Sequence, residues 1–328
     1  MRNNKTIRYS KNSLFLAKST KGKIKQIAKK VLPPIVVDGI RWLRNHDTYK
    51  PSQCKVQSVE KVNWSLDYEN RKKQLITKVI SYKKLLEPFG KNEPLPSGYG
   101  VAIDERCVEY PWLFANLRDQ PEILLDAGST LNHEFILNSP LIKRKVTHIL
   151  TLAPEENCFW KRGISYLFGD LRDIPIRDSY YDTIVCLSTL EHIGCDNTIY
   201  TQDARHRENH CEDFLLVMQE MCRVLKPGGT LLLTVPFGIY RHFGWFQQFD
   251  RKMLSSAVAA FGNVRGLTET FYRYTAEGWQ LADAKNCAEC EYVERTALLT
   301  KECHCGQAVE PDLAIAARAV VCVKLIKG

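Results

Sequence analysis

From residue 120 onward, short apolar segments alternate with helical ones, and this alternation constrains the fold more than any other feature of the sequence. Short apolar strands separated by helices predict a mostly parallel sheet that is covered by helices on both faces. A helical stretch is expected at 211–225, and a last strand is expected in the apolar run 314–326. The other expected strands are Ile123–Asp126, Val146–Leu152, Ile164–Phe168, Thr183–Leu187 and Thr230–Val235.

In sheets of this kind, ligands bind beyond the carboxyl ends of the strands, so the residues after each strand form the expected site. Gly128 allows close approach of the backbone to a ligand. The second strand ends at Thr151, where dinucleotide folds place an acid for the ribose, and Glu155 follows one turn later. The candidates are Asp126, Gly128, Ser129 and Asn132 after the first strand, Thr151 after the second, Asp170 and Leu171 after the third, and Ser188, Thr189, Glu191 and His192 after the fourth.

Three motifs occur in a fixed order along the chain: "LLDAGST", "GDLRDIPIRDSYYDTIVCLSTLEHIG" and "EMCRVLKPGGTLLLTVPFG". Over about residues 108–270 the chain resembles class I S-adenosylmethionine (SAM)-dependent methyltransferases. The resemblance implies a doubly wound, seven-stranded, mostly parallel Rossmann-like sheet, with SAM as the cofactor. A hydride-transferring dinucleotide enzyme would instead have a glycine fingerprint at the first strand.

The resemblance also implies roles by position. The turn after the first strand would hold the methionine moiety, and Asp170 with the Leu171 backbone would lie beside the adenine. Residues 188–192 would face the sulfonium and the acceptor. His192, next to Glu191, is the expected general base, because neutral imidazole suits that task near pH 7. The alternative is that Glu191 and His192 begin a helix and serve the structure alone.

Two positions depart from the family pattern. Thr130 stands where the turn usually has a second glycine, and Thr151 stands where the ribose acid is usual. Glu155 is the residue that could replace this acid. The alternative function is a non-catalytic Rossmann-fold partner, or a membrane-associated protein, that has lost cofactor binding.

The basic charge of the chain is concentrated at its beginning. Residues 1–50 hold 13 Lys and Arg against two acidic residues, whereas the rest holds 33 basic and 35 acidic residues. We therefore expect a basic amphipathic arm (1–50), a helical lead-in and linker (51–107) with a helix over 66–87, and a methyltransferase domain (108–328). A nearly neutral main domain argues against nucleic-acid binding.

Within the arm, residues 20–45 combine apolar residues at helical spacing with lysines beside them, which favours contact with an anionic membrane surface. The alternative is a helix packed on the domain with its lysines in water. The chain lacks a run of about 18 apolar residues, so it is expected to be cytoplasmic and at most peripheral on the inner membrane face.

The acceptor is suggested only by a looser resemblance, to methyltransferases of bacterial surface-polysaccharide synthesis. It implies O-methylation of a sugar or glycan precursor. Trp112, Trp245 and Phe246 are expected near the pocket, where aromatic faces can stack on a sugar.

A cysteine-rich insertion is expected at about 280–312, before the last strand. Two cysteine pairs at this separation can bind zinc tetrahedrally, and the alternative is a loop with incidental cysteines. His206 and His210 are a further candidate metal or phosphate pair, with a solvated loop as the alternative. The zinc candidates are Cys287, Cys290, Cys303 and Cys305.

Overall fold

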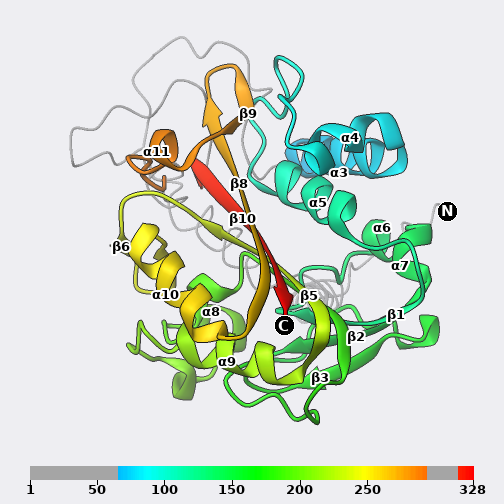
Figure 1. The fold of residues 1–328 in the computed structure, drawn as a ribbon, viewed down its shortest axis with the longest axis vertical. Coiled ribbons are helices and arrows are strands. Elements are labelled where there is room, and N and C mark those ends of the chain that lie inside the picture. Colours follow the sequence, from blue (N-terminus) through cyan, green and yellow to red (C-terminus); the bar gives the residue numbers. More distant parts are fainter. Residues whose placement is uncertain (1–65, 294–316) are drawn as a thin grey trace, which may run out of the picture. The chain divides into compact units, whose positions relative to one another are not determined.

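A computed structural model describes residues 66–293 and 317–328, which belong to one compact unit built around a single large sheet. The sheet has eight strands in the order β3-β2-β1-β4-β5-β10-β8-β9 (Figure 1). Its strands are β1 (Glu122–Ala127), β2 (Lys145–Thr151), β3 (Ser165–Phe168), β4 (Tyr181–Leu187), β5 (Leu225–Pro236), β8 (Val264–Thr275), β9 (Gly278–Ala282) and β10 (Ala319–Lys327). The five strands expected between residues 120 and 236, and the last strand, are confirmed.

The expected seven-stranded, mostly parallel sheet is wrong in its strand count and in its strand directions. β3, β2, β1, β4 and β5 are parallel, but β10 is antiparallel to both of its neighbours, and β9 is antiparallel to β8. The connection from β8 to β9 spans two residues, which is long enough for a hairpin and too short for a parallel crossover. The sheet is therefore mixed, with a parallel half and an antiparallel half.

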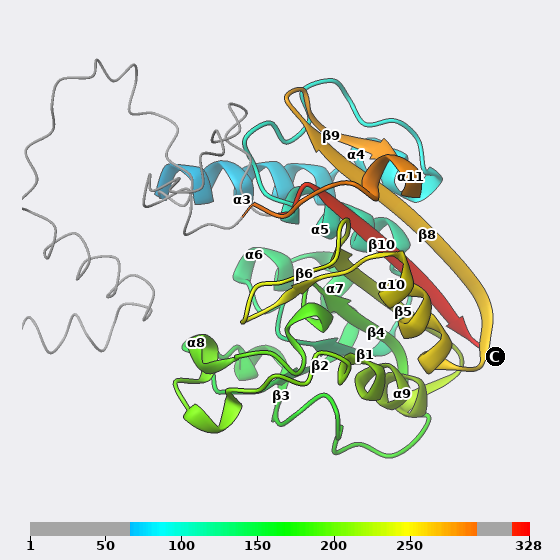
Figure 2. The ribbon, with the colours of Figure 1, turned by 90° about the vertical axis from the view of Figure 1, so that its left-hand side faces the viewer.

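Both faces of the sheet are buried, as the alternating pattern predicted. Leu124 and Val185 belong to one apolar cluster, whereas their neighbours Leu125 and Ile184 belong to the other. Helices α3 to α7 cover the first face, and α9 and α10 cover the second (Figures 1 and 2). Their bounds are α3 (Leu66–Ser81), α4 (Lys83–Lys91), α5 (Arg106–Asn116), α6 (Glu134–Leu137), α7 (Pro140–Lys143), α9 (Phe214–Val224) and α10 (Arg251–Phe261).

The helix expected over 66–87 is divided in two. Tyr82 has an extended backbone, with φ −119° and ψ 111°, and its carbonyl accepts the first hydrogen bonds of α4. The helix expected at 211–225 is confirmed as α9. The short elements are η2 (Trp160–Arg162), η3 (Leu190–His192), α8 (Thr198–Thr201), η4 (Ala204–His206), β6 (Arg241–His242), β7 (Gln247–Gln248) and α11 (Ala284–Cys287).

The β8–β9 hairpin holds the segment that leads into α5, and in both ribbon views it lies beside α3, α4 and α5 (Figures 1 and 2). Trp279 donates its backbone N–H to the Tyr99 carbonyl (2.8 Å) and its indole N–H to the Ile103 carbonyl (2.9 Å). At Gly278, which has φ +94°, a Cβ would lie 2.3 Å from the Tyr99 oxygen, so this approach needs glycine. The extra strand thus fixes the start of α5.

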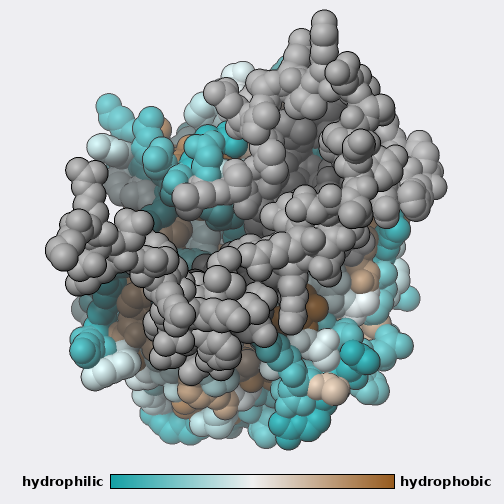
Figure 3. Space-filling model, turned by 180° about the vertical axis from the view of Figure 1, so that it is seen from behind, coloured by the Kyte–Doolittle hydropathy of each residue, from teal (hydrophilic) through white to brown (hydrophobic). Residues whose placement is uncertain are grey.

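The described surface is mixed in character. Where these residues are visible in Figure 3, hydrophilic and hydrophobic groups alternate, with hydrophilic groups along the lower edge. Trp160 and Phe168, near the β3 edge of the sheet, are among the exposed apolar side chains. Within residues 66–293 and 317–328, none of the helices has the length and apolar character needed to cross a bilayer.

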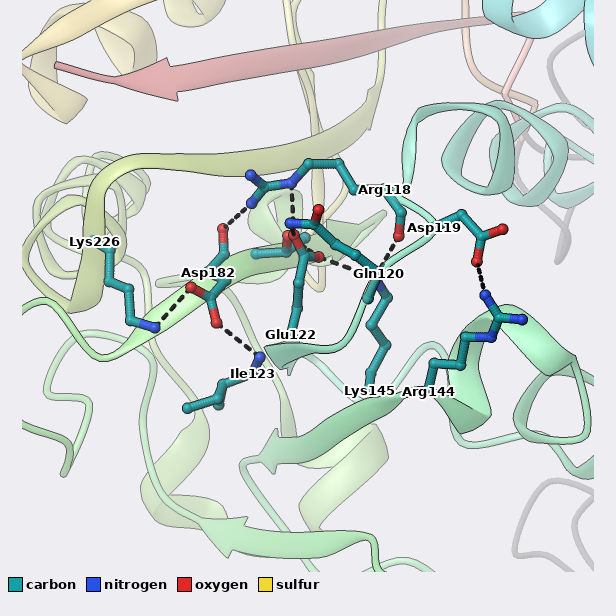
Figure 4. Close-up of polar contacts among 10 residues, drawn as sticks. Arg118, Asp119, Gln120, Glu122, Ile123, Arg144, Lys145, Asp182 and Lys226 are labelled. Carbon is teal, nitrogen blue, oxygen red and sulfur yellow. Dashed lines mark hydrogen bonds and ion pairs between the residues drawn. The ribbon is translucent and has the colours of Figure 1, made fainter.

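A polar network ties together the amino ends of the parallel strands (Figure 4). The Lys145 side chain is fully buried, and its ammonium donates to Glu122 Oε2 (3.0 Å) and to the Gln120 carbonyl (2.7 Å). Asp182 on β4 accepts from the Ile123 backbone (2.9 Å) and from Lys226 (2.6 Å). The network links β1, β2, β4 and β5 at the end of the sheet opposite to the expected site.

We expect Lys145→Met to lower the free energy of unfolding by about 3–5 kcal/mol, because it leaves Glu122 buried with its charge poorly matched. Urea unfolding followed by circular dichroism measures this change. Lys84→Met, at an exposed position of α4, is the matched control and should change stability by less than about 0.5 kcal/mol. Equal effects of the two substitutions would contradict this account of the network.

Candidate functional site

A cavity of about 420 Å³ lies at the carboxyl ends of the parallel strands. Its volume is in the range of small-molecule and cofactor sites. It is lined by residues that follow β1, β2, β3 and β4, together with residues from α5, α8 and η4. The cavity therefore lies where the alternating sequence pattern placed the site.

The structure brings most of the predicted cofactor residues to this cavity. The predicted residues that line it are Gly128, Thr151, Asp170, Leu171, Ser188, Thr189 and His192. The predicted residues that are outside its lining are Asp126, Ser129, Asn132 and Glu191. All four of the latter are buried, with exposed fractions of 0% to 7%.

Asp126 is engaged in holding its own turn. Its carboxylate accepts hydrogen bonds from the backbone N–H groups of Thr130 (3.2 Å) and Leu131 (2.8 Å) and from the Thr130 hydroxyl (3.2 Å). Burial raises the pKa of Asp126 to about 7, although these hydrogen bonds favour the charged form. Asp126 therefore contributes to the cavity indirectly, because it holds the backbone of the turn after β1 in place.

At Gly128 the turn after β1 packs against Thr189, which follows β4. Gly128 has φ +111°, and a Cβ there would lie 2.2 to 2.8 Å from side-chain atoms of Thr189. The next residue, Ser129, also has a positive φ (63°), and its buried hydroxyl has no hydrogen-bond partner among the described residues. A single glycine is thus enough to build the turn, and Thr130 is accommodated in place of a second one.

Asn132 reaches across to the loop after β2. Its amide nitrogen donates to Glu155 Oε2 (2.6 Å) and to the Asn157 carbonyl (2.9 Å), and its oxygen accepts from the Tyr166 hydroxyl (2.8 Å). Glu155 lines the cavity. The loop after β2 therefore places a carboxylate at the cavity, beside Asn132.

Asp170 is held in a cluster of opposite charges. Arg172 contacts both oxygens of Asp170 and also pairs with Glu208 (2.7 Å) and Asp213 (2.5 Å). Partial burial raises the pKa of Asp170, but the hydrogen bonds from Arg172 outweigh it and hold the pKa below its ordinary value. Asp170 is therefore an ionised hydrogen-bond acceptor at the cavity.

Ser188 belongs to a buried network that begins on α5. Its hydroxyl donates to Glu109 Oε1 (2.5 Å), and Thr234 donates to the same oxygen (2.6 Å). The other oxygen of Glu109 pairs with Arg106 (2.7 Å), and Arg106 lines the cavity. The network explains how Ser188 keeps a φ of +38°, which is strained for a residue with a Cβ.

His192 presents a neutral ring to the cavity. Its Nδ1 lies 3.0 Å from the Trp245 carbonyl, which can only accept, so Nδ1 carries the proton and Nε2 has a lone pair. Burial lowers the pKa of His192 to about 4, even though the hydrogen bond to Trp245 raises it. The arrangement can take a proton from a group bound beside Nε2.

Aromatic rings surround His192. Its ring centroid lies 5.2 Å from Trp245, 5.5 Å from Tyr200 and 6.0 Å from Phe246. Trp245 and Phe246, which were expected near the pocket, lie beside His192, which lines the cavity, but neither of them is part of the lining. Trp112, the third expected aromatic, is instead buried in the core between α5 and the sheet and is outside the cavity lining.

The proposed metal residues divide between described and undescribed parts of the chain. Cys287 and Cys290 are buried near α11, whereas Cys303 and Cys305 lie outside the described residues. Within the described ranges, no three His, Cys, Asp or Glu side chains form a metal-binding group. His206 ends η4 and His210 follows in a loop, so the two do not share a helical face.

Comparison with known families gives one match. Residues 146–233, from β2 to most of β5, match the family described as "Methyltransferase domain". The matched segment includes Asp170, Ser188 and His192, and it begins after the turn at Gly128. No curated protein matched this chain. Residues 146–233 therefore resemble a methyltransferase domain, and the cavity beside them lies at the carboxyl ends of the parallel strands.

Solved structures of similar shape include the 1,6-didemethyltoxoflavin-N1-methyltransferase of Burkholderia thailandensis, at 11% identity and a TM-score of 0.38, over 81% of this chain and 92% of that one. The CurJ carbon methyltransferase is 12% identical with a TM-score of 0.40, over 67% and 53%. The [4+2]-cyclase SpnF is 19% identical with a TM-score of 0.33, over 46% of this chain and 55% of that one. The likeness to a methyltransferase domain therefore rests on the family match over residues 146–233.

Sequence reasoning missed Arg106 and Glu109. Both lie on α5 before the first strand, so a search of the residues after each strand passes over them. Their spacing of three residues on a helix is a signal for an ion pair, but it gives no indication that a cavity lies beside it.

We expect the His192 ring to remain neutral down to about pH 5. Its folded pKa lies below the ordinary value of 6.5, so its neutral form stabilises the fold above pH 6.5, and this contribution is lost as the pH falls toward 4. Titration of histidine ring resonances by NMR, with His192→Asn to assign the signal, measures the pKa. A midpoint near 6.5 would contradict the buried, neutral ring.

Proposed function

We propose that the cavity binds SAM and that the protein transfers its methyl group to a hydroxyl of a sugar or glycan precursor at the cytoplasmic membrane face. The observation that carries the cofactor part is that Glu155, in the loop after β2, lines the cavity and is held by Asn132, which follows the glycine turn after β1. A carboxylate at this place can accept hydrogen bonds from both ribose hydroxyls.

The residues present fit the cofactor part by part. Gly128 lines the cavity with its backbone, and the Ser129 hydroxyl, which has no hydrogen-bond partner among the described residues, lies in the same turn. The Arg106 guanidinium at the cavity is suited to the cofactor's carboxylate. Asp170 and the backbone at Leu171 are suited to the adenine edge. We place Asn132 and Asp126 as positioning residues, because they act through Glu155 and through the turn.

Bound there, the cofactor supplies an electrophilic methyl group on a sulfonium. The protein's own contribution is to orient the two reactants and to accept the proton of the acceptor hydroxyl. His192 is our choice for the base, since it lines the same cavity as Ser188 and Thr189 and its Nε2 carries the lone pair. Glu191 is too deeply buried to serve as a second base at the cavity surface.

Support for a sugar acceptor comes from the aromatic rings beside His192. The faces of Trp245 and Tyr200 provide the kind of flat apolar surface on which sugar rings stack. The membrane part of the proposal rests on the basic arm, whose residues 20–45 lie outside the described residues.

We expect Glu155→Gln to weaken the binding of S-adenosylhomocysteine by about tenfold, since the ribose loses a charge-assisted partner. Calorimetric titration of the full chain measures the affinity. The matched control is Glu156→Gln, which removes a neighbouring exposed carboxylate from outside the cavity lining. Equal affinities of the two variants would argue against Glu155 as the ribose ligand.

We expect the full chain to sediment with vesicles containing phosphatidylglycerol and not with neutral phosphatidylcholine vesicles. Substituting Lys23, Lys25, Lys29 and Lys30 by Gln should abolish this binding, at about 1 kcal/mol per lysine near the surface. Raising the salt concentration should weaken the binding of the natural chain. Binding that ignores lipid charge would refute the membrane part of the proposal.

A further inference from the structure

The Glu109 carboxylate is the centre of a set of hydrogen bonds beside the cavity. Glu109 is 0% exposed, but two of its partners, Arg106 and Ser188, line the cavity. Its Oε2 accepts from Arg106 Nη1 (2.7 Å), and its Oε1 accepts from the hydroxyls of Ser188 (2.5 Å) and Thr234 (2.6 Å). One buried side chain thus holds two cavity residues from different elements, since Arg106 lies on α5 and Ser188 follows β4.

Thr234, on β5, closes this set of contacts. Its hydroxyl accepts from the backbone N–H of Ser188 (3.1 Å), and the same N–H donates to the Thr234 carbonyl (3.0 Å). The backbone and the side chain of Ser188 are therefore both fixed, which supports this residue at its positive φ of 38°. Thr234 is 0% exposed, so these hydrogen bonds are protected from competing water.

The directions of these hydrogen bonds determine what the two cavity residues offer to a ligand. A carboxylate that is paired with a guanidinium only accepts hydrogen bonds, so the Ser188 hydroxyl gives its proton to Glu109. The Ser188 oxygen can then accept from an N–H of a ligand. Arg106 uses Nη1 for Glu109, and the guanidinium has further N–H groups that can bind a carboxylate.

We propose that Glu109 is a positioning residue for the amino-acid end of the cofactor. The inference rests on the proposed function: Arg106 binds the carboxylate of that end, and Ser188 accepts from its ammonium. These two cofactor groups are attached to one carbon, and their two partners are held close together because they contact the same Glu109 side chain. Glu109 itself acts only through Arg106 and Ser188, whose freedom it reduces, and a preorganised site binds more tightly.

The test compares S-adenosylhomocysteine with 5′-methylthioadenosine, which keeps the nucleoside and the sulfur but lacks the amino-acid group. Calorimetric titration of the full chain measures both affinities. The natural chain should bind S-adenosylhomocysteine at least about tenfold more tightly than 5′-methylthioadenosine, because charge-assisted hydrogen bonds are lost with the amino-acid group. Glu109→Gln should weaken S-adenosylhomocysteine by about tenfold and 5′-methylthioadenosine by less than about twofold, because the new amide donates where the carboxylate accepted.

Glu122→Gln is the matched control. Glu122 is also a buried carboxylate that holds two cations, Arg118 and Lys145, but it lies at the opposite end of the sheet. This substitution should leave both affinities unchanged, so it separates a loss of stability from a loss of positioning.

Ser188→Ala is a second variant, which leaves the pair of Arg106 and Glu109 in place. It should weaken S-adenosylhomocysteine by about fivefold and leave 5′-methylthioadenosine unchanged. In a protein that already carries Glu109→Gln it should have little further effect, because the Ser188 hydroxyl is then no longer held in position. Additive effects of the two substitutions would contradict this coupling.

Equal weakening of the two ligands by Glu109→Gln, or weakening of neither, would overturn the positioning role and leave the proposed function intact. Equal affinities of the natural chain for the two ligands would do the same. If the natural chain bound neither ligand, the proposed function would be refuted and the positioning role with it.

Discussion

The turn after β1, held by the carboxylate of Asp126, is the constraint on which the rest of the site depends. Three hydrogen bonds fix Thr130 and Leu131 around this buried group, and the backbone at Gly128 is thereby pressed against Thr189. That contact joins the ends of β1 and β4, and both residues line the cavity. The Asp126 side chain therefore holds the turn at this part of the cavity, although it does not itself line the cavity.

The cavity is built from two parts of the fold. The loops after the parallel strands contribute Gly128, Glu155 and Asp170 to its lining. Arg106 on α5 and His192 on η3 line it as well, and the start of α5 is held by the β8–β9 hairpin through Trp279. Because the covering elements are separate from the sheet, they could change the site without changing the fold.

The sequence predicted the parallel half of the fold, and most of the residues that it marked as cofactor candidates line the cavity, because in such sheets the strand ends surround the ligand site. The antiparallel half could not be predicted in the same way. β9 is short, and its role appears only through the contact of Gly278 and Trp279 with the lead-in to α5. Glu191 is similar: its identity is visible in the sequence, but its burial (2% exposed), outside the cavity lining, is a property of the folded chain.

Asn132 was expected to bind the cofactor directly, but in the structure its side chain holds the loop after β2. It follows the first strand, as a cofactor residue would, but its amide is used to hold Glu155 and the loop after β2. The missing ribose acid was visible at Thr151, whereas its replacement depends on a loop that folds back. The sequence shows which strand end a residue follows. The packing of the folded chain decides which side chains reach the cavity.

The most direct test of the central claim is a crystal structure of the full chain with S-adenosylhomocysteine. The account predicts the ligand in the cavity, with its ribose hydroxyls at Glu155, its carboxylate at Arg106 and its adenine beside Asp170. A ligand bound elsewhere, or a ribose held by a different residue while Glu155 remains on Asn132 alone, would contradict it.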